Sequence, residues 1–186
     1  MIPGIVALLF AYVLSQFFRA FLAVLTPVLQ AELGVSAGDL ASASGWWFLA
    51  FAAMQIPIGE GLDRIGPRRT AGALMALGAA GAFLFAKAHS ALEIKLAMGL
   101  IGIGCAPVLM ASYFIFARSF APTIFGTLAA VTLGVGSLGN VGASVPLSAA
   151  VEAFGWRPTV LALAAVTGAV ALAILILVRD PPRLQS

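Results

Sequence analysis

Charged residues are scarce in this chain of 186 residues. Asp, Glu, Lys and Arg together make up 9% of the chain, whereas 62% of it is hydrophobic and the mean hydropathy is +1.09. An ordinary soluble domain has about a quarter charged residues. This lack of charge excludes water as the main solvent of the fold and predicts a protein buried in a lipid bilayer. The length leaves little beyond six membrane-spanning helices of about 20 residues each.

Cysteine and histidine are nearly absent as well. The chain has one cysteine, Cys105, and one histidine, His89, which are too few for a disulfide framework or a Cys and His metal site. No Ser, His and Asp pattern indicates catalysis, so we expect no enzyme activity, no metal and no cofactor. The pI of 9.6 does not indicate nucleic acid, because no basic stripe with interleaved aromatic residues accompanies it.

Six long apolar stretches remain once the polar segments are set aside. They predict an all-α polytopic membrane protein with a single six-helix transmembrane domain over residues 1–186. The expected spans are approximately residues 5–30, 40–58, 70–88, 92–116, 124–149 and 158–178. The many glycines and alanines inside these spans predict closely packed helices, because small residues let helix backbones approach one another in lipid.

The arginines are distributed unevenly along the chain. Most of them lie in the second loop, the fourth loop and the C-terminal tail, whereas Glu32, Asp39, Glu93 and Glu152 lie at or beside the odd-numbered loops. Lys and Arg near span ends mark the cytoplasmic side of a membrane protein. The pattern predicts an integral protein of the cell (inner) membrane with both termini in the cytoplasm, and the reversed orientation is the alternative.

The loop between the second and third expected spans carries the most specific pattern. It reads Gly59-Glu60-Gly61-Leu62-Asp63-Arg64-Ile65-Gly66-Pro67-Arg68-Arg69-Thr70. Gly59 is expected to permit close helix approach and Gly66 to adopt backbone torsions that other residues avoid. Asp63 can pair with a basic residue or accept from a helix N-terminus. A loop whose positive charge only fixes topology is the alternative.

This loop resembles the signature loop of the major facilitator superfamily of transporters. The matching positions are Gly59, Asp63, Arg64, Gly66, Arg68 and Arg69, whereas Gly61 stands where the family usually has Leu, and Pro67 where it often has a basic residue. The resemblance implies that the chain is a six-span half, of the N-terminal type, of such a transporter. It also implies that Asp63 contacts a helix of the opposite half as a gate latch.

Arg19 lies near the middle of the first expected span, and Tyr12, Gln16 and Arg19 follow the i, i+4, i+7 spacing of one helix face. An ionisable residue at a membrane helix centre costs about 2.5–3.5 kcal/mol, so it is a functional candidate. In the resembled family the first and fourth spans are implied to line the central cavity. Tyr12, Gln16, Arg19 and Tyr113 are therefore the substrate-cavity candidates. The alternatives for Arg19 are snorkelling and pairing with a carboxylate elsewhere.

These features predict transport of a small-molecule substrate by alternating access, and Arg19 favours an organic anion. The opposite half is expected to be a second six-span half or an identical chain in a homodimer. A non-transporting membrane assembly or scaffold subunit is the alternative function. No carboxylate lies near the middle of any expected span, so the sequence assigns no coupling proton.

Four further residues carry smaller expectations. Trp46 and Trp47 are predicted to lie in an interfacial aromatic belt. Lys95, near the outer end of the fourth span, is predicted to be solvated, and the alternatives are that it faces a vestibule or lies beside Glu93. Asn140 in the fifth span is predicted to bond across a tight helix contact.

Overall fold

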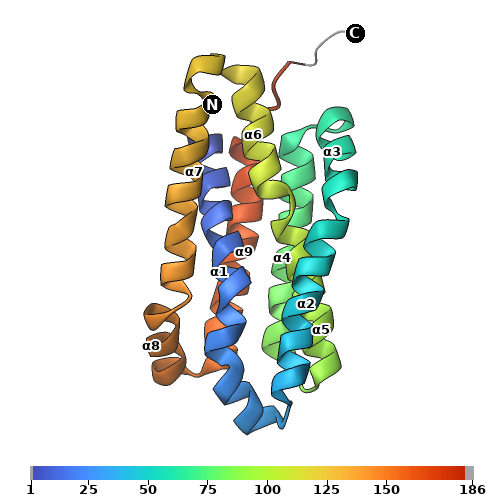
Figure 1. Ribbon diagram of the computed structural model, residues 1–186, viewed down its shortest axis with the longest axis vertical. Coiled ribbons are helices and arrows are strands. Elements are labelled where there is room, and N and C mark those ends of the chain that lie inside the picture. The colour runs from blue at the N-terminus through green and yellow to red at the C-terminus, as the bar shows by residue number, and fades with distance from the viewer. Residues whose placement is uncertain (1, 183–186) are drawn as a thin grey trace.

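The computed structural model describes residues 2–182, which form helices joined by short connections. The helices are α1 (Ile2–Leu33), α2 (Ala37–Ala53), α3 (Gln55–Arg64), α4 (Pro67–Lys87), α5 (Ala91–Cys105), α6 (Pro107–Ser119), α7 (Pro122–Gly142), α8 (Val145–Phe154) and α9 (Trp156–Leu177). They form six roughly parallel rods, because α2–α3, α5–α6 and α7–α8 each continue in one direction (Figure 1). The predicted all-α membrane fold is confirmed, and the six rods follow the six expected spans in order.

The rods pack in a fixed order around α4 and α1. α4 packs against α9 and α5, α5 packs against α2, and α1 packs against α7 and α9. α1 begins and α9 ends at the same end of the bundle, which also holds the α3–α4 and α6–α7 connections (Figure 1). We call this the terminal end. The opposite end holds the α1–α2, α4–α5 and α8–α9 connections.

Three of the rods are broken, each within one turn before a proline. The breaks separate α2 from α3, α5 from α6, and α7 from α8, and they precede Pro57, Pro107 and Pro146. Proline lacks a backbone N–H and its ring clashes with the carbonyl four residues earlier, so it kinks or breaks a helix. Each of these spans is therefore two helices rather than the single helix that its hydropathy predicts.

Five helical segments in the described chain are long and apolar enough to cross a membrane. They are Ile2–Leu33, Pro67–Lys87, Ala91–Ser119, Pro122–Phe154 and Trp156–Leu177. The sixth rod, α2–α3, contains Ser42, Ser44 and Gln55 and is interrupted at Met54. It still runs alongside the other rods for most of the height of the bundle (Figure 1).

Glycines set the closest helix contacts in the core. A Cβ on Gly104 of α5 would overlap the backbone of Gly78 on α4, and a Cβ on Gly102 would overlap the carbonyl group of Trp47 on α2. Neither backbone can yield without moving its helix. These contacts agree with the close packing that the small residues predict.

Candidate functional site

Arg19 lies near the middle of α1 and is exposed. Its guanidinium carbon is 5.6 Å from the centroid of the Phe48 ring on α2. The ion pairs among the described residues are Arg64–Glu60, Lys95–Asp39 and Arg118–Asp63, so none of the described carboxylates pairs with Arg19. One of the two alternatives for Arg19 was an ion pair with a carboxylate elsewhere in the bundle, and no such pair is found among the described residues. Its charge remains available to a ligand.

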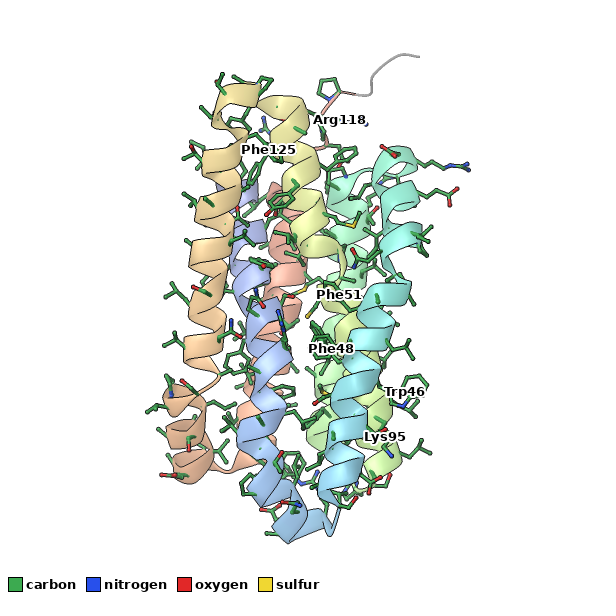
Figure 2. The ribbon with its side chains drawn as sticks, in the orientation of Figure 1. Trp46, Phe48, Phe51, Lys95, Arg118 and Phe125 are labelled. Atoms are coloured by element: carbon green, nitrogen blue, oxygen red, sulfur yellow. The ribbon has the colours of Figure 1, made fainter. Side chains whose placement is uncertain are left out.

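Phe48 belongs to an aromatic cluster on α2 that sequence reasoning missed. Trp47 lies edge-on to Phe48 with ring centroids 4.9 Å apart, and it stacks on Phe51 at 5.1 Å and an interplanar angle of 16°. Figure 2 shows Phe48 and Phe51 on the side of α2 that faces α1. Aromatic faces attract cations through the ring quadrupole. The i, i+3 spacing of the two phenylalanines was the available signal for a shared face.

The expectation of an aromatic belt fails for one of the two tryptophans. Trp46 is half-exposed and projects away from α1 (Figure 2), as an interfacial side chain can. Trp47 is buried, with 3% of its surface exposed. Adjacent residues on a helix point about 100° apart, so Trp46 can face outward while Trp47 packs into the core.

Tyr12 and Gln16 are in direct contact on α1, as their spacing predicts. Gln16 Nε2 donates a hydrogen bond to the Tyr12 hydroxyl oxygen at 2.9 Å. The Tyr12 ring lies against Gly136 of α7, where a Cβ would overlap the ring, and Gly139 lies against the Val13 carbonyl oxygen. The structure therefore brings two of the cavity candidates together and holds them against α7.

Tyr113 lies in a separate aromatic group. Its ring centroid is 5.7 Å from that of Phe125 on α7 and 6.4 Å from that of Phe116 on its own helix, α6. Figure 2 places Phe125 near the terminal end of the bundle. Tyr113 is half-buried in this group.

Asn140 does not make the bond that was predicted for it. Its side chain is exposed and has no hydrogen bond to the described residues, whereas the preceding residue, Gly139, makes the tight contact with α1. The helix contact was expected correctly, but the amide side chain points away from it.

The signature loop turns α3 back onto α4 at Gly66. This residue has φ +102°, which L-residues with a side chain rarely adopt, so the expectation for Gly66 is confirmed. Gly59 makes no close helix approach within the described chain, because a Cβ added there would meet no atom within 4 Å. Gly61 makes the close approach instead, and its Cβ would lie 3.1 Å from the Thr70 side chain. The unusual glycine at this family position therefore has a packing role.

Asp63 pairs with a basic residue, which was one of its two expected contacts. Its Oδ1 accepts from Arg118 Nη2 at 3.2 Å, and the Arg118 guanidinium carbon lies 4.1 Å from the Phe114 ring centroid. The Asp63 side chain remains 66% exposed. Arg64, next to it, pairs with Glu60 at 3.1 Å across one helical turn. The ion pair with Arg118 fastens α3 to α6 at the terminal end.

Asp180, which follows α9, caps the first turn of α4. Its Oδ1 accepts from the backbone N–H of Arg68 at 2.8 Å, and the Arg68 Nε donates to the carbonyl oxygen of Leu175. Gly66 has no side chain with which to satisfy the free N–H groups at this helix N-terminus, so a distant carboxylate takes that place. Arg69 is exposed beside it. The glycine at the cap position was the only local signal of this contact.

Lys95 is not a solvated lysine and does not pair with Glu93. Its Nζ donates to Asp39 Oδ1 at 2.8 Å, which joins α5 to the first turn of α2 at the opposite end. Asp39 also forms a capping box with Ser36. The hydrogen bond from Lys95, followed by those from Ser36, lowers the pKa of Asp39 from its usual 3.8 to about 2.

Asp39→Asn is expected to lower the melting temperature at neutral pH but to have little effect near pH 2. A carboxyl group whose pKa is depressed by folding stabilises the folded state above its unfolded pKa, and this contribution is lost as the pH falls through the folded pKa. The window for Asp39 therefore runs from pH 3.8 down to about 2. Thermal unfolding at pH 7 and at pH 2 measures the difference, with exposed Glu152→Gln as the control. An equal effect of Asp39→Asn at both pH values contradicts the prediction.

These features together define a class of protein. A bundle of six helical rods, five of them apolar enough to cross a membrane, with a cation at mid-bundle depth and a loop turned by Gly66 at the terminal end, fits one half of a membrane transporter. The sequence matches the family model of the Major Facilitator Superfamily over residues 8–186, and the chain belongs to this family. A search of curated proteins found no match. Membership makes the chain an integral membrane protein that transports a solute, and members of the family are transporters rather than enzymes.

Proposed function

We propose that the chain transports a small organic anion across the cell membrane by alternating access. Arg19 carries this proposal, because it stands at mid-helix depth without a carboxylate partner among the described residues and faces the Phe48 ring. A cation at the depth of the bilayer core is costly unless an anion or water compensates its charge. An anionic substrate supplies that compensation, and the Tyr12–Gln16 pair offers hydrogen bonds on the same helix.

The opposite half of the transporter comes from a second six-span domain or from a second copy of the chain. The two halves of such transporters are parallel repeats, related by an axis along the membrane normal, with the substrate between them. In the described chain the α7–α8 rod is the least covered of the apolar segments, with 17% of its most apolar window buried. This open face supports a further domain against it.

The distribution of charge supports cytoplasmic termini in the cell (inner) membrane. The terminal end carries Arg64 at the end of α3, Arg68 and Arg69 in the first turn of α4, and also Arg118 and Arg179. Arginines that cluster around short connections at one end of a membrane bundle indicate that this end lies on the cytoplasmic side. Asp63 lies at that end with an exposed carboxylate, which fits a contact between halves in the outward-open state.

Uptake into liposomes tests the proposed function. The purified chain is reconstituted and cross-linked to measure its dimer content, and initial uptake is recorded for radiolabelled succinate and benzenesulfonate. Phenyltrimethylammonium, a cation of similar size to benzenesulfonate, is the matched control probe. We expect uptake of an anion above that of empty liposomes and none of the cation. Dimeric protein that takes up neither anion contradicts the proposal and favours the scaffold alternative.

A further inference from the structure

A cluster of three basic side chains lies at the end of the bundle opposite the signature loop. Lys87 is the last residue of α4, His89 lies in the α4–α5 connection, and Arg157 lies in the first turn of α9. Together with Ala86, Pro158 and Leu161 they line a pocket of about 380 Å³. Two segments that are far apart in the sequence, the end of α4 with the connection after it and the start of α9, therefore place their basic groups around one space.

The two permanent cations of this pocket are not neutralised by the described chain. Arg157 Nη1 donates to the carbonyl oxygen of Ala86 at 2.9 Å, and its guanidinium carbon lies 4.3 Å from the Trp156 ring centroid. Lys87 Nζ lies 6.0 Å from the Phe83 ring centroid. Neither cation belongs to any ion pair of the described residues. A guanidinium group has five N–H donors, so Arg157 keeps donors for a ligand.

Two carboxylates at this end of the bundle accept hydrogen bonds from neutral donors. Glu93 Oε2 accepts from the backbone N–H of His89 at 2.6 Å, and Glu32 Oε2 accepts from Trp156 Nε1 at 2.6 Å. Neither carboxylate forms an ion pair with Lys87 or Arg157 in the described chain. The pocket therefore presents an arrangement of N–H donors and positive charge that suits an oxyanion with several acceptor oxygens.

The surroundings of the pocket indicate where such an anion comes from. Lys87 and Arg157 lie at the ends of two apolar rods, α4 and α9, where the bilayer surface is expected. Leu161 lines the pocket on its apolar side and is 40% exposed, and Phe83 one turn before Lys87 is 52% exposed. A phosphate beside exposed apolar side chains at this depth is the arrangement of a phospholipid, whose acyl chains lie along the helices.

We propose that this pocket binds the phosphate group of an anionic phospholipid. Arg157 donates to the phosphate oxygens from a side chain already fixed by Ala86, whereas Lys87 and His89 approach from the other helix end and the connection. The acyl chains then cover Leu161 and Phe83. The inference is independent of the substrate site, because Arg19 and Phe48 take no part in it.

Native mass spectrometry of the purified chain tests this proposal. The detergent-solubilised protein is titrated with dioleoylphosphatidylglycerol or with dioleoylphosphatidylcholine, and the lipid-bound fraction is measured. The test variant is Lys87→Gln/His89→Gln, because both side chains are exposed and their loss should not affect folding. Arg157→Gln is a second variant, and Arg179→Gln at the terminal end is the charge-matched control. Inorganic phosphate is added as a competitor in a separate titration.

We expect wild type and the control to bind phosphatidylglycerol in preference to phosphatidylcholine. Removal of Lys87 alone from the pocket weakens binding of an anionic lipid about fivefold, so the double variant should lose most of this preference. Equal phosphatidylglycerol binding by wild type and both pocket variants overturns the proposal. Displacement of the lipid by millimolar phosphate, with phosphate bound in its place, overturns the lipid assignment in favour of a soluble anion.

Discussion

Replacing Arg19 with glutamine is expected to reduce the apparent affinity for a transported anion about 10- to 100-fold. A hydrogen bond to a charged group contributes about 1.5–3 kcal/mol, and each 1.4 kcal/mol is a factor of ten. No described carboxylate competes with a ligand for this guanidinium. We therefore expect a larger loss of affinity than would follow from replacing a cation that already belongs to one of the ion pairs of this chain. Initial uptake rates against anion concentration, in reconstituted liposomes, measure the effect.

Stability measurements separate a substrate role of Arg19 from a structural one. Arg19 is exposed in the described chain and its one marked contact is the Phe48 ring at 5.6 Å, so Arg19→Gln should leave the melting temperature nearly unchanged. Arg19→Lys retains the charge but loses the planar fork of donors and should transport with intermediate affinity. Arg179→Gln is the control for total charge. Unchanged affinity in Arg19→Gln would falsify the anion site.

The sequence was sufficient to predict the fold, because its main signals are local. Each apolar stretch is defined by consecutive residues, and the signature loop is a pattern of residue spacing within one short segment of the chain. The prolines were visible too, but hydropathy does not distinguish a kinked span from a straight one. The breaks before Pro57, Pro107 and Pro146 therefore appear only in the structure.

Side-chain partners were predicted poorly because they depend on how each helix is rotated. Asp180 caps α4 from 112 residues away, and Lys95 reaches Asp39 across 56 residues. Gly59 and Gly61 show the same limit within one motif. Two residues apart on a helix they point about 200° apart, so only one of them can face α4. The sequence shows both glycines but not which one is at the interface.

The candidate cavity face was predicted in part for the same reason. Tyr12 and Gln16 share a face through their spacing on one helix, and the structure joins them with a hydrogen bond. Phe48 reaches Arg19 from a different helix. A contact between helices needs the packing of both, which spacing on one helix does not contain.

Replacing Gly139 with alanine is expected to lower the thermal stability of the bundle strongly. A Cβ at this position would overlap the Val13 carbonyl oxygen and lie 2.8 Å from the backbone nitrogen of Phe17. Backbone atoms cannot rotate away, so α1 and α7 must separate, and such overpacking costs about 1–3 kcal/mol. Gly134→Ala on the same helix is the matched control, because a Cβ there meets nothing within 4 Å. Thermal unfolding in detergent compares the two.

The control should move in the opposite direction. Alanine favours helix over glycine by about 1 kcal/mol in a helix interior, so Gly134→Ala should keep or raise the melting temperature while Gly139→Ala lowers it. Equal melting temperatures for the two variants would show that α1 and α7 do not pack as described.

A substitution at Gly136, on the same helix, distinguishes an effect on transport from an effect on stability. Its Cβ would overlap the ring of Tyr12 rather than backbone, and a side chain can turn away where a helix axis cannot. Gly136→Ala should therefore disturb the Tyr12–Gln16 hydrogen bond and reduce uptake, with a smaller loss of stability than Gly139→Ala. If α7 only packs against α1 and has no role in the cavity face, Gly136→Ala and Gly139→Ala will each lose uptake in proportion to their loss of stability. If it positions the cavity face, Gly136→Ala will lose uptake out of proportion.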